Sequence, residues 1–201
     1  MKRIVVAITG ASGSIYGLRL VEELLKKECR VTLLFSKAGL EVMRYETGLG
    51  WEGTTGQRLQ LMRDYFGGDR HLEHLGCDDL FAAIASGSSA PDAVVIAPCS
   101  MGTAGRIAAG LSGNLIERVA DVALKERRDL ILVPRETPLS AIHLENLLTL
   151  SRAGAQILPA MPAFYHKPQS LAEVVDFVVG KILDGLGIEH ALFTRWGEEK
   201  G

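Results

Sequence analysis

The sequence predicts a doubly wound α/β fold, in which a mostly parallel sheet carries helices on both faces, as in Rossmann-like and flavodoxin-like proteins. Two observations predict it. Short apolar runs of strand length alternate with longer stretches of helical periodicity, and a glycine-rich turn joins the first run to the first helical stretch. The 201 residues suffice for one hydrophobic core and contain no internal repeat or linker. We therefore expect a single domain over residues 1–201.

The first half of the chain contributes two strands and two helices. Residues 3–9 are an apolar run that is too short for a secretory signal and is punctuated at once by glycine, so we expect a strand. Residues 14–27 repeat apolar side chains at helical spacing and predict a helix. A second strand at residues 30–35 and a second helix at residues 37–46 follow. Residues 47–76 are glycine-rich and poorly periodic, and we leave their secondary structure unassigned.

The second half continues the alternation. A buried strand at residues 93–97 is expected to close at Pro98, with a helix opening near Ser100. The remaining strands are expected at residues 130–133 and 156–158, and the remaining helices at residues 114–127, 140–152 and 171–186.

Composition excludes several classes of function. The net charge of −2 lacks the basic footprint of a nucleic-acid-binding protein. No run is long and apolar enough for a membrane span. The three cysteines, Cys29, Cys77 and Cys99, are widely spaced and form no CxxC pair, which argues against a disulfide framework or a zinc site. We expect a cytoplasmic protein without a membrane or nucleic-acid partner.

The turn Gly10-Ala11-Ser12-Gly13 leads from the first predicted strand into the first helix. Backbone N–H groups at such a helix start attract an anion, although the same turn also serves a purely structural role in many α/β proteins. A nicotinamide dehydrogenase is disfavoured, because the second strand ends in Phe35-Ser36-Lys37 without an acidic residue for a ribose hydroxyl. No tyrosine is followed four residues later by lysine, which is the acid–base spacing of short-chain dehydrogenases.

Small hydroxyl residues flank other strands of the predicted sheet. Ser36 follows the second strand, Ser88 precedes the next one in the stretch 86–91, and Ser100 to Thr103 follow that strand. Each serine alone is ordinary turn chemistry. We expect them to converge on one edge of the sheet, where they suit a phosphate and a polyol chain. Cys99 lacks an evident histidine or aspartate partner, so we interpret it as a packed thiol rather than a nucleophile.

A second group of candidates is cationic. Arg118 and Lys125 lie seven positions apart on one predicted helix and hence on one face. Arg135 and Glu136 stand between two prolines directly after a buried strand, where ligands bind in such folds. Tyr165 lies in a proline- and aromatic-containing stretch, and Lys181 on the last helix. Arginine and lysine suit phosphate recognition, although surface cations are usually only solvated.

These motifs together resemble the UbiX-type flavin prenyltransferases, from the first strand to Arg195-Trp196. The segments that carry the resemblance are Gly10-Ala11-Ser12-Gly13, Tyr45-Glu46-Thr47, Ser86-Gly87-Ser88, Pro98-Cys99-Ser100, residues 120–127, Val133-Pro134-Arg135-Glu136-Thr137-Pro138 and Pro162-Ala163-Phe164-Tyr165-His166. Residues 48–75 stand outside it.

The resemblance implies a homo-oligomer, dodecameric in that family, with sites shared between subunits. It implies an FMN site formed by Gly10, Ala11, Ser12, Ser36, Ser100, Met101, Gly102, Thr103 and Arg135. It implies a site for dimethylallyl phosphate formed by Ser88, Arg118, Lys125, Arg135, Tyr165 and Lys181, with Ser12, Glu46, Lys125 and Glu136 as catalytic candidates. Lys181 stands where many relatives carry arginine, so its bidentate contact is in doubt.

The implied reaction moves a dimethylallyl group from dimethylallyl phosphate to N5 and C6 of reduced FMN. Its product, prenylated FMN, would serve a UbiD-type decarboxylase. The flavin is itself the nucleophile, and the sequence has no aspartate-rich metal motif, so we expect metal-independent catalysis. Two alternatives stay open: an FMN-dependent decarboxylase of similar fold and a non-catalytic flavin carrier. Undecided are the choice between monophosphate and diphosphate donors, the receiving decarboxylase and the proton-transferring carboxylate.

Overall fold

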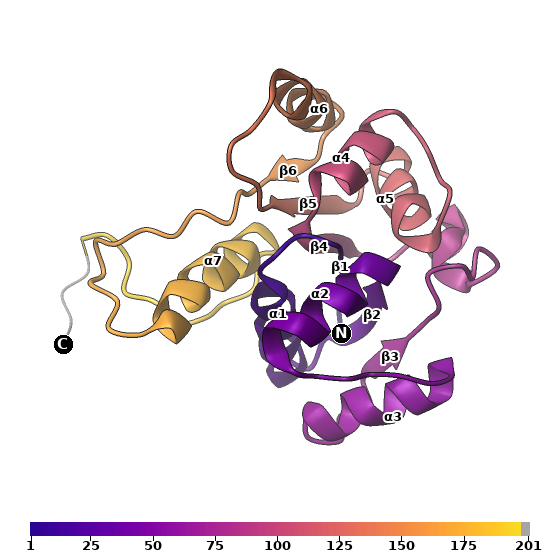
Figure 1. Ribbon diagram of the computed structural model, residues 1–201, viewed down its shortest axis with the longest axis horizontal. Helices are drawn as coiled ribbons and strands as arrows, with labels where there is room; N and C mark the ends of the chain where they lie inside the picture. Colours follow the sequence, from indigo (N-terminus) through magenta and orange to yellow (C-terminus); the bar gives the residue numbers. More distant parts are fainter. Residues whose placement is uncertain (198–201) are drawn as a thin grey trace.

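A single parallel sheet organises the protein in the computed structural model, which describes residues 1–197 (Figure 1). Within them six strands follow the order β3-β2-β1-β4-β5-β6, and all five pairings are parallel. The strands are β1 Arg3–Ile8, β2 Arg30–Phe35, β3 Leu72–His74, β4 Ala93–Cys99, β5 Asp129–Pro134 and β6 Gln156–Ile157. This is the Rossmann order, whose direction reverses between β1 and β4. The predicted doubly wound fold is confirmed.

Helices cover both faces of the sheet. Their bounds are α1 Ser14–Lys26, α2 Lys37–Thr47, α3 Thr55–Tyr65, α4 Met101–Ala108, α5 Leu115–Lys125, α6 Ala141–Arg152 and α7 Leu171–Gly185. Strand β1 shows how the layers divide, because its side chains alternate between them. Ile4, Val6 and Ile8 pack with residues of α1 and α7 in one core layer. Val5 and Ala7 pack with residues of α4, α5 and α6 in the other.

Close contact between α1 and the sheet depends on Gly17. A Cβ atom at this position would lie 2.2 Å from the carbonyl oxygen of Ala97 in β4 and 2.6 Å from the Ile8 side chain in β1. No side chain fits there without moving the helix away from the two central strands. Gly17 therefore brings the start of α1 against the point where the strand order reverses.

Residues 47–76, which the sequence left unassigned, contain α3 and the edge strand β3. Helix α3 buries only one residue, Met62, so it has almost no amphipathic period to detect. Its start did carry a signal: Thr54 and Gln57 form a capping box. Strand β3 is only three residues long, which is too short for an alternating pattern to stand out.

The structure corrects the expectation that β4 closes at Pro98. The strand continues to Cys99, with a shift of register against β5 between Ile96 and Cys99. Proline has no N–H to give to the ladder. Its carbonyl oxygen still pairs with β1, because it accepts the Thr9 backbone N–H at 3.2 Å. The other predicted elements agree with the structure to within a few residues at their ends.

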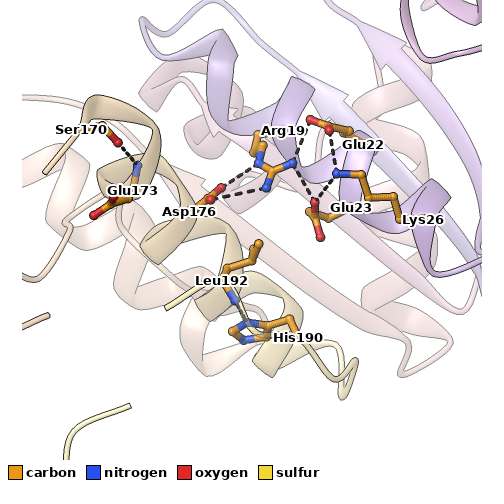
Figure 2. Close-up of polar contacts among 9 residues, drawn as sticks. All are labelled: Arg19, Glu22, Glu23, Lys26, Ser170, Glu173, Asp176, His190 and Leu192. Atoms are coloured by element: carbon orange, nitrogen blue, oxygen red, sulfur yellow. Dashed lines mark hydrogen bonds and ion pairs between the residues drawn. The ribbon is translucent and has the colours of Figure 1, made fainter. Parts of the chain in front are cut away.

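The last helix, α7, crosses back from the β6 edge to pack on α1 (Figure 1). Figure 2 shows the ionic part of this contact, in which Arg19 of α1 makes a two-pronged contact with Asp176 of α7 at 2.7 and 3.4 Å. The connections before and after α7 run out together beyond the sheet, at the left of Figure 1. We call these two connections, residues 158–170 and 187–197, the arm.

Among residues 1–197 no helix combines the length and the apolar character that crossing a membrane requires.

Candidate functional site

Thr9, the fully buried residue that follows β1, links β1 to β4 at the point where the strand order reverses. Its hydroxyl donates to the Pro98 carbonyl oxygen at 2.9 Å and accepts the Ser100 backbone N–H at 2.8 Å. The carboxyl ends of β1 and β4 are thereby tied side by side, and this is the place where doubly wound sheets bind ligands. Sequence reasoning missed Thr9, although its position between an apolar strand and the glycine turn was a usable signal.

The predicted turn Gly10-Ala11-Ser12-Gly13 lies at this edge and leads into α1, as expected. Gly13 has a φ of 106°, a left-handed conformation that favours glycine. The anion at the start of α1 is a side chain of the protein itself. The Glu46 carboxylate, from α2, accepts the Gly13 N–H at 2.9 and 3.1 Å and the Ser14 N–H at 2.9 Å. Glu46 and the turn, both predicted site components, are thus in direct contact.

The surroundings of Glu46 keep its carboxylate ionised. Partial burial acts to raise its pKa, but hydrogen bonds from the Ser12 hydroxyl and from the Ser14 and Gly13 backbone amides outweigh that effect. The pKa of Glu46 is therefore lowered below its ordinary value. The same contacts place two predicted catalytic residues, Ser12 and Glu46, together at the sheet edge.

The other hydroxyl residues of this edge act first as helix caps. Ser36 accepts the Gly39 N–H at 3.0 Å at the start of α2. Ser100 accepts the Thr103 N–H at 3.3 Å and donates to the Thr103 hydroxyl at 3.0 Å at the start of α4. Met101 and Thr103 are buried in that first turn, whereas Gly102 is exposed. The caps orient the starts of both helices toward the edge that also holds the glycine turn.

Arg135 joins this edge from the end of β5. Its backbone N–H donates to the Cys99 carbonyl oxygen at 3.4 Å, and its guanidinium lies close enough to Tyr16 of α1 to counteract the burial that raises the pKa of that tyrosine. The Arg135 Nε is buried and has no hydrogen-bond partner among the described residues. Glu136 is exposed, and its carboxylate accepts the Thr137 backbone N–H at 3.1 Å.

The structure corrects the expectation that all the hydroxyl loops share one edge. Ser88 precedes β4, and Lys125 ends α5 just before β5, so both lie where the parallel strands begin, opposite the glycine turn. Arg118 donates to the Ala85 carbonyl oxygen at 3.0 Å, and the Lys125 amino group approaches Gly87. Arg118, Lys125 and Ser88 therefore form a second group, with Arg118 and Lys125 on one helix face as predicted.

Tyr165 and Lys181 form a third group, on the arm and on α7. Tyr165 contributes to a cavity of about 460 Å³ that is also lined by Lys167, Arg195 and Trp196. The ring of Trp196 packs edge-on against that of Tyr165 with centroids 5.3 Å apart, and the indole is 81% exposed. Sequence reasoning missed Arg195 and Trp196 as site residues, because nothing local predicts that the chain end returns to Tyr165.

The Cys99 thiol and the residue types that bind metal ions complete the description of the site. Cys99 is fully buried, and burial raises the pKa of its thiol to about 12, which agrees with a packed thiol rather than a nucleophile. Within residues 1–197 no group of histidine, cysteine, aspartate and glutamate side chains is placed to hold a metal ion. The site thus offers carboxylates, hydroxyls and cations to a bound ligand.

Comparisons with known proteins agree on one family. The model of the Flavoprotein family matches residues 1–183. The flavin prenyltransferase UbiX of Halalkalibacterium halodurans is 54% identical over 196 residues, which cover 97% of this chain and 93% of that protein. The crystal structure of AnUbiX (PadA1) in complex with FMN and dimethylallyl pyrophosphate has a TM-score of 0.86 and 39% identity, covering 99% of both chains. A dodecameric FMN-dependent UbiX-like decarboxylase from Escherichia coli O157:H7 has a TM-score of 0.84 and 38% identity, covering 98% of this chain and 100% of that chain.

Proposed function

The chain belongs to the family of flavin prenyltransferases named UbiX, and from this premise we propose which of its residues perform the reaction. It is a transferase that prenylates FMN. The observation that carries this function is 54% identity over nearly the whole of both chains. The two alternative functions, an FMN-dependent decarboxylase and a non-catalytic flavin carrier, are not needed to explain the residues of the site.

Reduced FMN is assigned to the edge where β1, β4 and β5 end. The buried Arg135 Nε supports this assignment, because a buried N–H without a partner is costly and a flavin or phosphate oxygen would satisfy it. The Gly13 and Ser14 N–H groups are already engaged by Glu46. The flavin phosphate would therefore be held by the other predicted donors of this edge rather than by the start of α1.

When bound, reduced FMN supplies the nucleophile, so the protein needs no nucleophile of its own. The task of the chain is to orient the donor, stabilise the departing phosphate and move protons. Arg135, Lys125 and Lys181 are assigned to the phosphate because they carry positive charge. Glu46, ionised beside Ser12, is assigned to holding or accepting a proton, and Glu136 is the second candidate for that role.

We propose that several copies of the chain assemble so that one site draws on all three groups. Within one chain, Lys125 and Ser88 lie at the opposite edge of the sheet from Glu46, and Tyr165 lies out on the arm. A shared site would bring these groups together, and the description of a relative of the same fold as dodecameric supports assembly into an oligomer. A dodecamer is the expected state.

The product, prenylated FMN, would pass to a UbiD-type decarboxylase that uses it as cofactor. We place the reaction in the cytoplasm, where a reducing environment suits the three unpaired cysteines.

One experiment tests the function directly. The protein is incubated anaerobically with reduced FMN and either dimethylallyl monophosphate or diphosphate, and the flavin is weighed by mass spectrometry. We expect a gain of one five-carbon unit, which a metal chelator leaves intact. An unchanged flavin mass with FMN-loaded protein would contradict the proposal, and loss of turnover with the chelator would contradict metal-independent catalysis.

A further inference from the structure

Three side chains contact one carboxylate on α7, that of Asp184. Arg195 approaches it with both terminal nitrogens, at 3.1 and 2.7 Å, and Lys181 approaches it at 3.2 Å. His190 Nε2 lies 3.1 Å from the same carboxylate. Two of these three partners, Arg195 and His190, come from the arm. A single exposed ion pair contributes little, but here three groups share one partly shielded carboxylate.

The role of His190 in this cluster follows from its other ring nitrogen. The Leu192 backbone N–H points at His190 Nδ1 at 3.2 Å, as Figure 2 shows. A backbone N–H can only donate, so Nδ1 must accept, and the ring hydrogen then sits on Nε2, facing Asp184. Nε2 therefore donates to the Asp184 carboxylate, which the cations Lys181 and Arg195 also contact.

One member of this cluster, Arg195, also lines the 460 Å³ cavity. Arg195 and Trp196 line that cavity together with Tyr165, and both belong to the last part of the arm, which Asp184 ties to α7. Phe193 helps to hold it there, because its ring packs on Phe177 with centroids 4.8 Å apart. Gly180 leaves room for this packing, since a Cβ atom there would lie 2.5 Å from the Phe193 ring.

From these contacts we propose that Asp184 is a positioning residue for the phosphate of the allylic donor. It holds the arm on α7, so that Arg195 and Trp196 line the cavity, and it keeps Lys181 and Arg195 side by side. The proposal rests on the proposed function, in which Tyr165 and Lys181 bind that phosphate. Lysine offers a point charge in place of an arginine fork, so a fixed position of its amino group matters more here.

The test compares Asp184→Asn with Asp176→Asn, a matched change on the same helix that breaks the pair with Arg19 away from the cavity. With saturating reduced FMN, Asp184→Asn should raise the KM for dimethylallyl phosphate about tenfold, while kcat stays within about twofold. Asp184→Glu should restore part of the loss. Asp176→Asn should lower the melting temperature without changing this KM. A wild-type KM in a folded Asp184→Asn protein would overturn the proposal.

A second measurement does not depend on turnover. Trypsin cleaves after Arg195, whose guanidinium Asp184 holds, so Asp184→Asn should lose residues 196–201 several-fold faster than Asp176→Asn. Equal cleavage rates would refute the docking role even if the enzyme is active. If the wild type makes no prenylated flavin, the proposed function fails, whereas faster cleavage of Asp184→Asn would still support the docking role.

Discussion

Both carboxylate oxygens of Glu46 accept the backbone N–H of Gly13, at 2.9 and 3.1 Å, so a side chain from α2 caps the start of α1. A carboxylate at a helix start is stabilised by the N–H groups and by the helix dipole. The candidate proton-transfer residue is therefore held by rigid backbone. The glycine conformation that directs this N–H also sets where the carboxylate sits.

Replacing Glu46 with glutamine should leave FMN bound but slow product formation. The amide oxygen can still accept from Gly13, whereas the group can no longer take a proton, and such losses are on the order of 10²–10⁴-fold. Single-turnover assays with mass detection of the flavin measure the rate. Glu41→Gln, an exposed change on the same helix, is the matched control and should keep the wild-type rate. A normal rate for Glu46→Gln would assign the proton to Glu136 or to the phosphate.

Glu46 also predicts a dependence of stability on pH. Its folded-state pKa lies below the ordinary 4.5, so its stabilising contribution is present above that value and is lost as the pH falls through the lowered pKa. The difference in unfolding free energy between the wild type and Glu46→Gln should be largest at neutral pH and should shrink below pH 4.5. Urea unfolding at several pH values measures it. A difference that grows on acidification would contradict the assigned contacts.

Arg135 and Glu136 are neighbours for which we predict different losses. Arg135 has a buried Nε that finds no hydrogen-bond partner within residues 1–197, so Arg135→Ala should chiefly weaken FMN binding. Glu136 is exposed, so Glu136→Gln should chiefly lower the rate with ligands still bound. Flavin titration and turnover at saturating ligands separate the two effects. Weakened flavin binding in Glu136→Gln, with Arg135→Ala unaffected, would reverse the assignment.

A shared site predicts that two inactive variants can repair each other. Glu46→Gln and Lys125→Ala alter groups at opposite edges of the sheet, so a mixed assembly contains sites with both native residues. Random mixing of co-expressed, differently tagged chains should restore about a quarter of the sites. Doubly purified mixed oligomers are assayed for prenylated flavin. No activity above that of either parent would mean that each site lies within one chain.

The contact of Gly17 with the sheet predicts a stability cost for the smallest possible side chain. Gly17→Ala would place Cβ 2.2 Å from the Ala97 carbonyl oxygen, and such overpacking costs about 1–3 kcal/mol. In α3, a Cβ atom added at Gly56 would meet nothing within 4 Å, so Gly56→Ala should stabilise the protein by about 0.4–1 kcal/mol. Chemical denaturation measures both. Equal effects of the two substitutions would contradict the packing of α1.

The sequence predicted those parts of the site whose position follows from whether a residue precedes or follows a strand. The turn before α1 and the caps Ser36 and Ser100 follow strands, so the sequence showed that they lie at the edge of the sheet where the strands end. The placement of Ser88 was also readable, because a residue that precedes a parallel strand lies at the opposite edge. The sequence did not reveal the Glu46–Gly13 contact, since this contact depends on how α2 packs beside α1.

The same distinction explains the other misses. Helix α3 escaped prediction because it buries only Met62 and so has no apolar stripe. The meeting of Arg195 with Asp184 joins an α7 carboxylate to the end of the arm, and it depends on how the arm folds back, including the packing of Phe193 on Phe177. No short window of sequence contains that information.

The crossing of α7 onto α1 has a consequence for biosynthesis. Arg19 and Asp176 are 157 positions apart, so the layer that covers one face of β1 is completed only once α7 has been made, long after β1. During translation the apolar residues Ile4, Val6 and Ile8 lack their α7 cover, while α4 to α6 can already protect the other face. Until α7 has been made, only α1 and its neighbours cover this face of β1, so the two faces of the sheet are completed at different stages of synthesis.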